Sequence, residues 1–333
     1  MKPDISVITV NYNGLELTAA MIASLRQYVS TPIEIIVVDN GSHLLAERFP
    51  GIVAIRSERN LGFAGGNNLG LRAARGRYLL LLNNDTEVGD DSLHYLCDAL
   101  ENRPHWGAVS PKIRFADPPR PIQFAGYTPL SKITLRNGLV GFNREDDGSY
   151  DTPHETPYAH GAAMMVRRET IEQAGEMPEL YFLYYEELDW SERITRSGWD
   201  IGYEPRCTVF HKESRTTGRE SPLRTYYLTR NRLLFGWRNR HGAARLLTVL
   251  YQCGVAAPKN AATALLRGRG DLARATVRGV GAFFTMKNKT GEMRPSGAAS
   301  QYPVRWVDRQ RHTPRKPHRA TGMFYAACAI FGL

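Results

Sequence analysis

An apolar run that ends in amides and a carboxylate is the part of this sequence best suited to chemistry. Residues Tyr78–Leu82 are followed directly by Asn83, Asn84 and Asp85. A short apolar run bounded by polar residues predicts a buried parallel strand. Ligands of open α/β sheets bind outside the carboxyl ends of such strands. We therefore expect Asp85 to handle a metal ion or a phosphate, rather than to cap the helix expected near Ser92.

A second apolar run ends in the same way, at Asp39. The run Ile33–Val38 also has the length of a buried strand. An acidic residue that ends such a strand can accept hydrogen bonds from the base or ribose of a nucleotide, although Asp39 could instead be a helix N-cap. Two strands that deliver Asp to one sheet edge indicate a site for a charged, hydroxyl-rich ligand.

Three carboxylates lie close together in the segment that contains Glu186, Glu187 and Asp189. They could form a solvated helix face, but aromatic and apolar residues surround them. Burial and neighbouring like charges both raise the pKa of a carboxyl group, which suits a general base. His211 follows an apolar run and, beside such carboxylates, is a candidate metal ligand.

The elements that must position these residues alternate between strands and helices. We expect strands at residues 5–10, 33–39, 52–55, 78–82, 158–166 and 207–210. We expect one helix at 15–28, a second that follows residue 68 and ends near residue 75, and a third at 186–196. This order predicts an α/β fold with a mostly parallel central sheet flanked by helices. Residues 116–157 are rich in Pro, Gly and Asp, and we expect a substrate-facing insertion of loops and short strands there.

A nicotinamide-binding site is excluded by the pattern of glycines. No Gly-x-Gly-x-x-Gly follows the first strand, and no Walker-type lysine is present. The Gly/Asn-rich segment Asn60–Asn68 therefore reads either as turn chemistry or as a close approach of the backbone to a ligand.

The charge is divided unevenly between two parts of the chain. Residues 1–214 carry 21 Lys and Arg against 29 Asp and Glu, whereas residues 215–333 carry 22 against 4. We expect a catalytic domain at 1–214 and a basic, mainly helical region at 215–333, with helices at 223–237, 243–257 and 261–284 and a mobile part at 287–319. Solvated arginines would explain the charge, but Arg-bearing amphipathic helices favour an anionic membrane surface. Nucleic acid is disfavoured because no recognised motif or interleaved aromatics are present.

Cysteine usage and hydropathy bear on the location. The four cysteines are far apart and form no Cys-x-x-Cys pair, which disfavours a disulfide framework or a zinc ribbon. No apolar run approaches the roughly 18–20 residues needed to span a bilayer, and no signal peptide is evident. We expect a cytoplasmic protein that is peripheral on the inner face of the cell membrane.

Five motifs, in order, carry a resemblance to family 2 glycosyltransferases. They are Ser6–Asn13, Val37–Ser42, Asn60–Asn68, Leu82–Asp85 and the succession of Glu186–Asp189, His211 and Tyr227–Asn231. The last group is similar to the bacterial rhamnosyltransferase-like branch. The resemblance covers roughly residues 4–235 and implies a GT-A fold.

The resemblance also implies a reaction and its participants. A sugar, with rhamnose or another deoxysugar favoured, would pass with inversion from a nucleoside-diphosphate donor to a glycan or polyprenyl-linked acceptor. Mg²⁺ or Mn²⁺ would be held by Asp85 and His211, and Glu187 would be the base, with Asp189 and Glu186 as alternatives. Asn83 stands where the family has the first Asp of its Asp-x-Asp motif. Nucleotide-sugar binding falls to Asn11, Tyr12, Asp39, Asn60, Gly66, Asn67, Asn83 and Asn84.

Two other functions stay open at this point. Asn83 and Glu187 both depart from the family pattern, which would fit a catalytically impaired nucleotide-sugar-binding protein. The basic C-terminal region would fit a nucleic-acid-binding protein. The oligomeric state is not indicated by the sequence.

Overall fold

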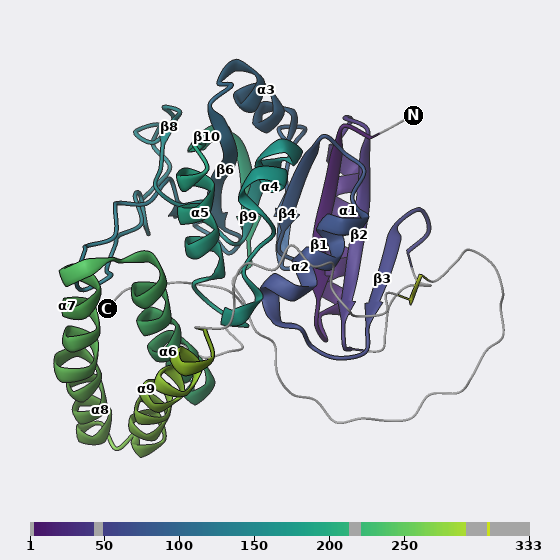
Figure 1. Cartoon of the computed structure of the whole chain (residues 1–333). Helices are drawn as coiled ribbons and strands as arrows, with labels where there is room; N and C mark the ends of the chain where they lie inside the picture. Colours follow the sequence, from purple (N-terminus) through teal and green to yellow (C-terminus); the bar gives the residue numbers. More distant parts are fainter. Residues whose placement is uncertain (1–2, 43–48, 213–220, 291–304, 307–333) are drawn as a thin grey trace, which may run out of the picture.

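One mixed sheet organises the protein. The computed structural model describes residues 3–42, 49–212, 221–290 and 305–306. Within these residues the strand order is β11-β3-β2-β1-β4-β9-β6-β10-β5, with β7 beside β6 and β8 beside β10 (Figure 1). The strands are β1 (Ile5–Asn11), β2 (Ile33–Asn40), β3 (Val53–Ser57), β4 (Tyr78–Leu82), β5 (Thr86–Val88), β6 (Trp106–Phe115), β7 (Ile122–Phe124), β8 (His154–Glu155), β9 (Ala163–Arg167), β10 (Asp200–His211) and β11 (Arg305–Trp306).

Helices cover the sheet and continue beyond it. They are α1 (Leu15–Tyr28), α2 (Gly62–Ala73), α3 (His94–Asn102), α4 (Arg168–Ala174), η2 (Glu179–Tyr181), α5 (Glu186–Arg196), α6 (Pro222–Asn239), α7 (Gly242–Tyr251), η4 (Gln252–Ala256), α8 (Ala257–Leu266) and α9 (Gly270–Thr290). The α/β expectation with helical C-terminal elements is confirmed.

Most strands of the sheet run in one direction. β3, β2, β1 and β4 are mutually parallel, and β6 is parallel to β10. β9 lies between β4 and β6 and is antiparallel to both. The expected strand at 158–166 therefore begins later, at Ala163, and residues 158–162 instead lead into it. This reversal joins the two parallel halves of the sheet.

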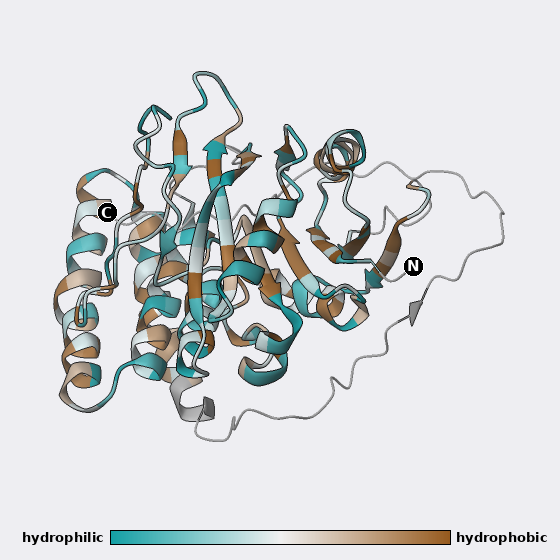
Figure 2. Ribbon diagram, turned by 90° about the horizontal axis from the view of Figure 1, so that it is seen from above, coloured by the Kyte–Doolittle hydropathy of each residue, from teal (hydrophilic) through white to brown (hydrophobic). Residues whose placement is uncertain are grey.

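Both faces of the central strands are buried, as expected for parallel strands covered by helices. Ile5 and Val7 of β1 pack in one apolar cluster with Met21 of α1. Ile8 of the same strand faces the opposite side of the sheet, where it packs in a second apolar cluster with Leu69 of α2. Hydrophobic residues accordingly concentrate on the central strands (Figure 2). The apolar runs that predicted these strands thus form the core.

The Gly/Asn-rich segment is helical, because its glycines let α2 lie close to β1. A Cβ on Gly66 would stand 2.7 Å from Val10 Cγ1, and one on Gly70 would stand 2.3 Å from Ile8 Cγ2. These distances are too short for any side chain, so Gly is required at both positions. A close backbone approach is therefore made to a strand, while the approach to a ligand stays a prediction, and the reading as a turn is wrong for the residues after Gly62.

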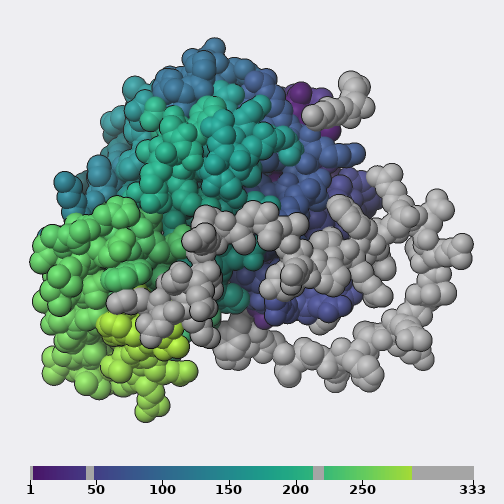
Figure 3. Space-filling view, viewed as in Figure 1, coloured from purple at the N-terminus to yellow at the C-terminus, as the bar shows by residue number. Residues whose placement is uncertain are grey.

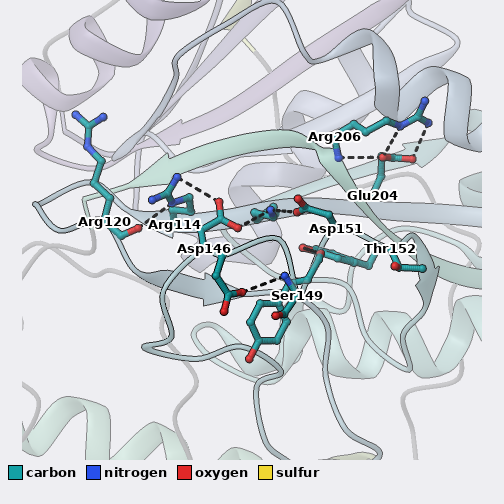
Figure 4. Close-up of polar contacts among 12 residues, drawn as sticks. Arg114, Arg120, Asp146, Ser149, Asp151, Thr152, Glu204 and Arg206 are labelled. Atoms are coloured by element: carbon teal, nitrogen blue, oxygen red, sulfur yellow. Dashed lines mark hydrogen bonds and ion pairs between the residues drawn. The ribbon is translucent and has the colours of Figure 1, made fainter.

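The insertion at 116–157 is fastened to the end of β6 by buried charge. Lys112 Nζ is 2.7 Å from Asp146 Oδ1 and also contacts Asp151, while its side chain is only 5% exposed. Arg114 Nη1 lies 3.2 Å from Asp146 Oδ2 (Figure 4). Since a buried lysine needs paired carboxylates, these contacts fix the insertion against the sheet edge that carries His211.

The helices α6–α9 form a lobe at one side of the sheet (Figures 1 and 3). The helix expected at 261–284 is wrong as a single element, because the chain turns at Arg267–Arg269 between α8 and α9. Gly268, with φ of 70°, supplies the left-handed residue that such a turn requires. Within the described ranges no helix combines the length and the hydropathy needed to cross a bilayer. The expected mobile stretch 287–319 lies largely outside the described residues.

Candidate active site

Asp85 and His211 meet at the end of the sheet. Asp85 follows β4, and His211 ends β10, where it pairs with Thr86 of β5. His211 Nε2 lies 3.1 Å from Asp85 Oδ1, and the two side chains are 0% and 6% exposed. Lys212 N also donates to Asp85 O at 2.9 Å. Two residues 126 positions apart in the chain are thus brought to one point, as the sequence predicted.

Gln123 orients the His211 ring. Its Oε1 lies 2.8 Å from His211 Nδ1, and both side chains are fully buried. An amide oxygen only accepts, so Nδ1 donates; in a neutral ring the lone pair then lies on Nε2, the nitrogen that faces Asp85. Outer partners of this kind are typical of metal-ligating histidines. The sequence analysis missed Gln123, which lies in the loop-rich insertion and belongs to no motif.

The Asp85–His211 pair fits a divalent cation. A carboxylate oxygen and an imidazole nitrogen are both ligands for Mn²⁺ and related ions. Adjacent ligands of an octahedral ion with bonds of about 2.1 Å stand roughly 3 Å apart, close to the 3.1 Å observed between Oδ1 and Nε2. The donor types and their spacing are therefore compatible with one shared ion, and their role as metal ligands stays a prediction.

The residues that precede β9 connect Glu187 with the same edge of the sheet. Ala162 O accepts from Asn83 N at 2.9 Å, which ties this segment to the end of β4. A Cβ on Gly161 would stand 3.8 Å from the Glu187 carboxyl carbon. His160 Nδ1 accepts from Ala162 N at 3.1 Å and holds the turn. One short segment therefore hydrogen-bonds the backbone N–H of Asn83 and has the carboxyl group of Glu187 beside its Gly161.

The three carboxylates of α5 have different surroundings. Burial, with smaller opposing effects of backbone hydrogen bonds, raises the pKa of Glu187 to about 7. Burial and the charge of Glu187 raise the pKa of Glu186 well above its ordinary value, and among the described residues neither Glu186 oxygen has a hydrogen-bond partner. Asp189 Oδ2 instead accepts from Tyr181 Oη at 2.6 Å and Arg238 Nε at 2.8 Å. Glu187 is thus poised to titrate near neutrality.

A hydrogen-bonded chain of side chains joins the ends of β4, β1 and β2. Asn84 Nδ2 donates to Thr18 Oγ1 at 3.1 Å, and Thr18 Oγ1 donates to Asn11 Oδ1 at 3.0 Å. Asn11 Nδ2 donates to Ser42 Oγ at 2.9 Å, and Ser42 donates to Asp39 Oδ1 through its hydroxyl and its N–H. Asn11 and Asp39 are also partners in the β1–β2 register. The polar groups expected at this edge therefore converge.

The remaining predicted binding residues lie around the start of α2 and α1. Asn60 Oδ1 accepts from Gly62 N at 2.8 Å and from Asn40 Nδ2 at 3.0 Å. Asn67 Nδ2 donates to Phe63 O at 3.0 Å, while Tyr12 is half-buried in the turn after β1. These contacts shape the loops at the edge, and a role of each side chain in binding stays a prediction.

A further group of potential ligands lies at the other end of β10. The ligand atoms of His105, Glu155 and Asp200 lie within 4.8 Å of one another, with His105 and Glu155 exposed. Asp200 begins β10 and His211 ends it. This cluster is therefore separated from Asp85 by the length of the strand and cannot share its ion.

Comparison with known proteins decides the family. Residues 6–175 match the family model for Glycosyl transferase family 2. The chain belongs to glycosyl transferase family 2. The resemblance to this family identified in the sequence is confirmed.

Two curated relatives of this glycosyltransferase extend the similarity. The N-acetylglucosaminyl-diphospho-decaprenol L-rhamnosyltransferase of Mycobacterium tuberculosis is 27% identical over 247 residues, which cover 66% of this chain and 80% of the relative. The low-salt glycan biosynthesis hexosyltransferase Agl10 of Haloferax volcanii is 29% identical over 244 residues, which cover 70% and 76%.

Solved structures show that the glycosyltransferase has the GT-A fold. GalNAc-T7 with UDP, GalNAc and Mn²⁺ matches with a TM-score of 0.53 at 18% identity, over 63% of this chain and 44% of that chain. The mannosyltransferase PcManGT of Pyrobaculum calidifontis, in complex with GDP-Man and Mn²⁺, matches with a TM-score of 0.50 at 16% identity, over 89% and 82%.

Proposed function

We propose that this glycosyltransferase transfers a deoxyhexose, rhamnose in particular, from a nucleoside diphosphate to a hydroxyl of a lipid-linked or polysaccharide acceptor, with inversion. The carrying observation is the meeting of Asp85 and His211 at 3.1 Å, with the Glu187 carboxyl group beside Gly161 of the adjoining segment. The rhamnosyltransferase and hexosyltransferase names of the relatives support the class of sugar, and a decaprenol-linked acceptor is named for the first.

Asp85 and His211 are the residues that would hold Mg²⁺ or Mn²⁺. When bound, such an ion supplies positive charge that stabilises the diphosphate as it leaves. The Mn²⁺ named for the structural neighbours supports a divalent ion. Asn83 would contribute at most an amide oxygen, so Asp85 carries the negative charge of the motif. Gln123 keeps Nε2 of His211 directed at the ion.

Glu187 is the proposed base for a single displacement. Its carboxylate takes the proton of the acceptor hydroxyl as the new oxygen–anomeric carbon bond forms on one face of the sugar. The bond from the anomeric carbon to the diphosphate oxygen breaks on the opposite face, and the diphosphate keeps the electron pair. Asp189 is occupied by Tyr181 and Arg238, so we assign it a structural role and favour Glu187.

The edge formed by Asp39, Asn11 and Ser42 is the proposed nucleoside site. Asp39 would accept hydrogen bonds from the ribose or the base, with Tyr12 against the base. The chain of hydrogen bonds from Asp39 to Asn84 connects this site with the Asp85 motif. Nucleoside and diphosphate would therefore be held by one continuous polar edge.

A donor panel tests this function. In the presence of Mn²⁺, one of dTDP-rhamnose, UDP-sugars and GDP-sugars should raise Tm by several degrees, since a ligand at about 100 times its Kd adds roughly 2.7 kcal/mol. With a polyprenyl-diphosphate-linked sugar as acceptor, the same donor should give a product of inverted anomeric configuration by NMR. Donor binding without transfer to any acceptor would instead favour a catalytically impaired nucleotide-sugar-binding protein.

The helices α6–α9 are the proposed membrane-facing region of a peripheral enzyme. Residues 221–290 contain 13 Lys and Arg and a single acidic residue, Asp271. Large apolar side chains that are 45–89% exposed lie on these helices, namely Leu223, Leu246, Leu247, Leu250, Val255, Leu265, Leu266, Val277 and Phe284. Cationic helices with exposed apolar residues suit anionic lipid, and a cytoplasmic-leaflet location would bring the site to a lipid-linked acceptor.

Vesicle binding tests the membrane proposal. The full chain should sediment with vesicles of phosphatidylglycerol and phosphatidylcholine but not with pure phosphatidylcholine. The double variant L246E/L250E should lower the partition coefficient about 10-fold, because two apolar contacts with the bilayer are lost. Tyr28→Glu, at a less exposed residue (39%) on α1, is the control outside these helices. Equal binding of both variants, or binding of DNA that outcompetes the vesicles, would contradict the proposal.

A further inference from the structure

The backbone that leads into α5 has an unusual conformation. Phe182, Tyr184 and Tyr185 have φ of 65°, 70° and 78°. Left-handed φ values are disfavoured for bulky residues and persist only where the surroundings impose them. Glu186 and Glu187 follow at once as the first turn of α5. The direction in which the Glu187 carboxylate points is therefore set by a segment that would not adopt this conformation alone.

One side-chain amide of α6, that of Asn231, contacts three backbone carbonyls of this segment. Asn231 Nδ2 lies 3.1 Å from Tyr181 O, 2.7 Å from Leu183 O and 2.9 Å from Tyr184 O. An amide nitrogen has only two hydrogens, so these three acceptors share them. Asn231 is 0% exposed. No water can replace it without opening the interface between α6 and the segment.

Arg230 completes the arrangement from the adjacent position. Its Nη2 donates to Tyr181 O at 2.5 Å, and its Nε donates to Asn231 Oδ1 at 2.7 Å. The guanidinium also lies 4.7 Å from the centre of the Tyr227 ring, and that ring stacks on Phe182 at 5.3 Å. The same helix therefore holds the backbone carbonyls of the segment and the side chain of Phe182, one of the residues with a left-handed φ.

Further contacts of α6 fix the segment on both sides. Arg232 Nε donates to Tyr185 Oη at 2.7 Å, and Arg238 Nε reaches Asp189 one turn into α5. On the opposite side, Phe182 O accepts from Phe63 N at 2.9 Å. The conformation is therefore determined from several directions, and the amide of Asn231 is its central contact.

We propose that Asn231, oriented by Arg230, is a positioning residue that holds the 181–185 backbone so that Glu187 faces the acceptor hydroxyl. This inference rests on the proposed role of Glu187 as the base. It assigns a task to the Tyr227–Asn231 motif, which the sequence analysis singled out without giving it a chemical role. Removing the amide hydrogens should disturb the base without touching the nucleoside edge.

Asn231→Asp in the full chain is the principal test, because it is isosteric but has no hydrogens to donate. We expect kcat to fall about 10²-fold, the cost of a small misplacement of a catalytic group, with the donor KM changed less than about 3-fold. The midpoint of the acidic limb of the pH–rate profile should move, because Glu187 gains access to water. Arg230→Lys keeps the charge and should lower kcat less, in the same direction.

Hydrogen exchange and a matched variant allow the positioning role of Asn231 to be tested separately from the proposed function. In Asn231→Asp, peptides covering 181–187 should exchange faster, while those covering β1 and β4 should not. Asn239→Ala removes a buried amide of the same helix that donates to Phe235 O and should change kcat less than about 3-fold. Equal kinetic losses in Asn231→Asp and Asn239→Ala, with unaltered exchange at 181–187, would overturn the positioning role. A wild type that is inert with every donor would overturn the proposed function alone. The hydrogen-exchange comparison would still test whether Asn231 holds the 181–185 backbone.

Discussion

Replacing Glu187 with Gln is expected to lower kcat for sugar transfer by about 10³-fold, within the range that general base catalysis contributes. Gln has the same shape but cannot take the acceptor proton. The packing of residue 187 beside Gly161 should stay intact, because only a carboxylate oxygen is exchanged for an amide nitrogen. Initial rates with the donor found in the panel, together with the nucleotide Kd from calorimetry, measure the effect. The Kd should change less than about 3-fold.

The pH dependence of the wild type supplies the control for Glu187. Burial raises the pKa of Glu187 to about 7, so the carboxyl group is protonated and unable to act as a base below that pH. Transfer should therefore rise with pH through about 7, and this limb should vanish in Glu187→Gln. Glu192→Gln, on the same helix but paired with Arg240, should retain both the rate and the limb. If Glu186→Gln abolished the limb while Glu187→Gln kept it, the assignment of the base would move to Glu186.

Substitution of Asp85 by Asn should remove both metal binding and transfer. The change keeps the size of the side chain but removes the negative charge that faces His211. We expect the Mn²⁺ affinity measured by calorimetry to fall at least 10²-fold and kcat/KM to fall about 10³-fold, because the diphosphate would leave without a fixed counter-charge. His211→Gln should act in the same direction with a smaller effect, since an uncharged ligand is lost.

Glu87→Gln provides the matched control for Asp85. Glu87 lies two residues further along, is about one-third exposed and pairs with Lys212. Its substitution should leave Mn²⁺ affinity unchanged within about 2-fold. Full transfer by Asp85→Asn in the presence of a metal chelator would show that the reaction proceeds without an ion at this position.

The parts of the fold predicted from the sequence are those specified by local pattern. The run Tyr78–Leu82 predicted β4, and helix α1 was predicted with both of its ends. The meeting of Asp85 with His211 was also predicted, because parallel strands bring their carboxyl ends to one edge. Motif order and strand polarity were enough for these features.

The features that were missed depend on tertiary contacts. The helical state of Gly65 and Gly66 was hidden because glycine usually weakens helices, whereas here it permits contact with Val10. Gln123 lies in a segment without regular pattern and acquires its role only by reaching His211. The single helix expected at 261–284 ignored Gly268, whose left-handed φ ends α8. The first two misses reflect a local preference overruled or completed by a distant part of the chain, whereas the third overlooked a local signal at Gly268.

Helix α6 also determines how this enzyme can be recombined with its relatives. On one side its backbone is so close to α9 that a Cβ on Gly279 would stand 2.8 Å from Tyr226 O. On the other side the Asn231 side chain donates hydrogen bonds to the backbone that precedes α5. A chimera joined before Pro222 would thus place a foreign α6 against the segment that precedes Glu187, whereas a junction after Asn239 would place a foreign α9 against the native α6. Exchanges between homologues should therefore take α5, α6 and α9 from the same parent.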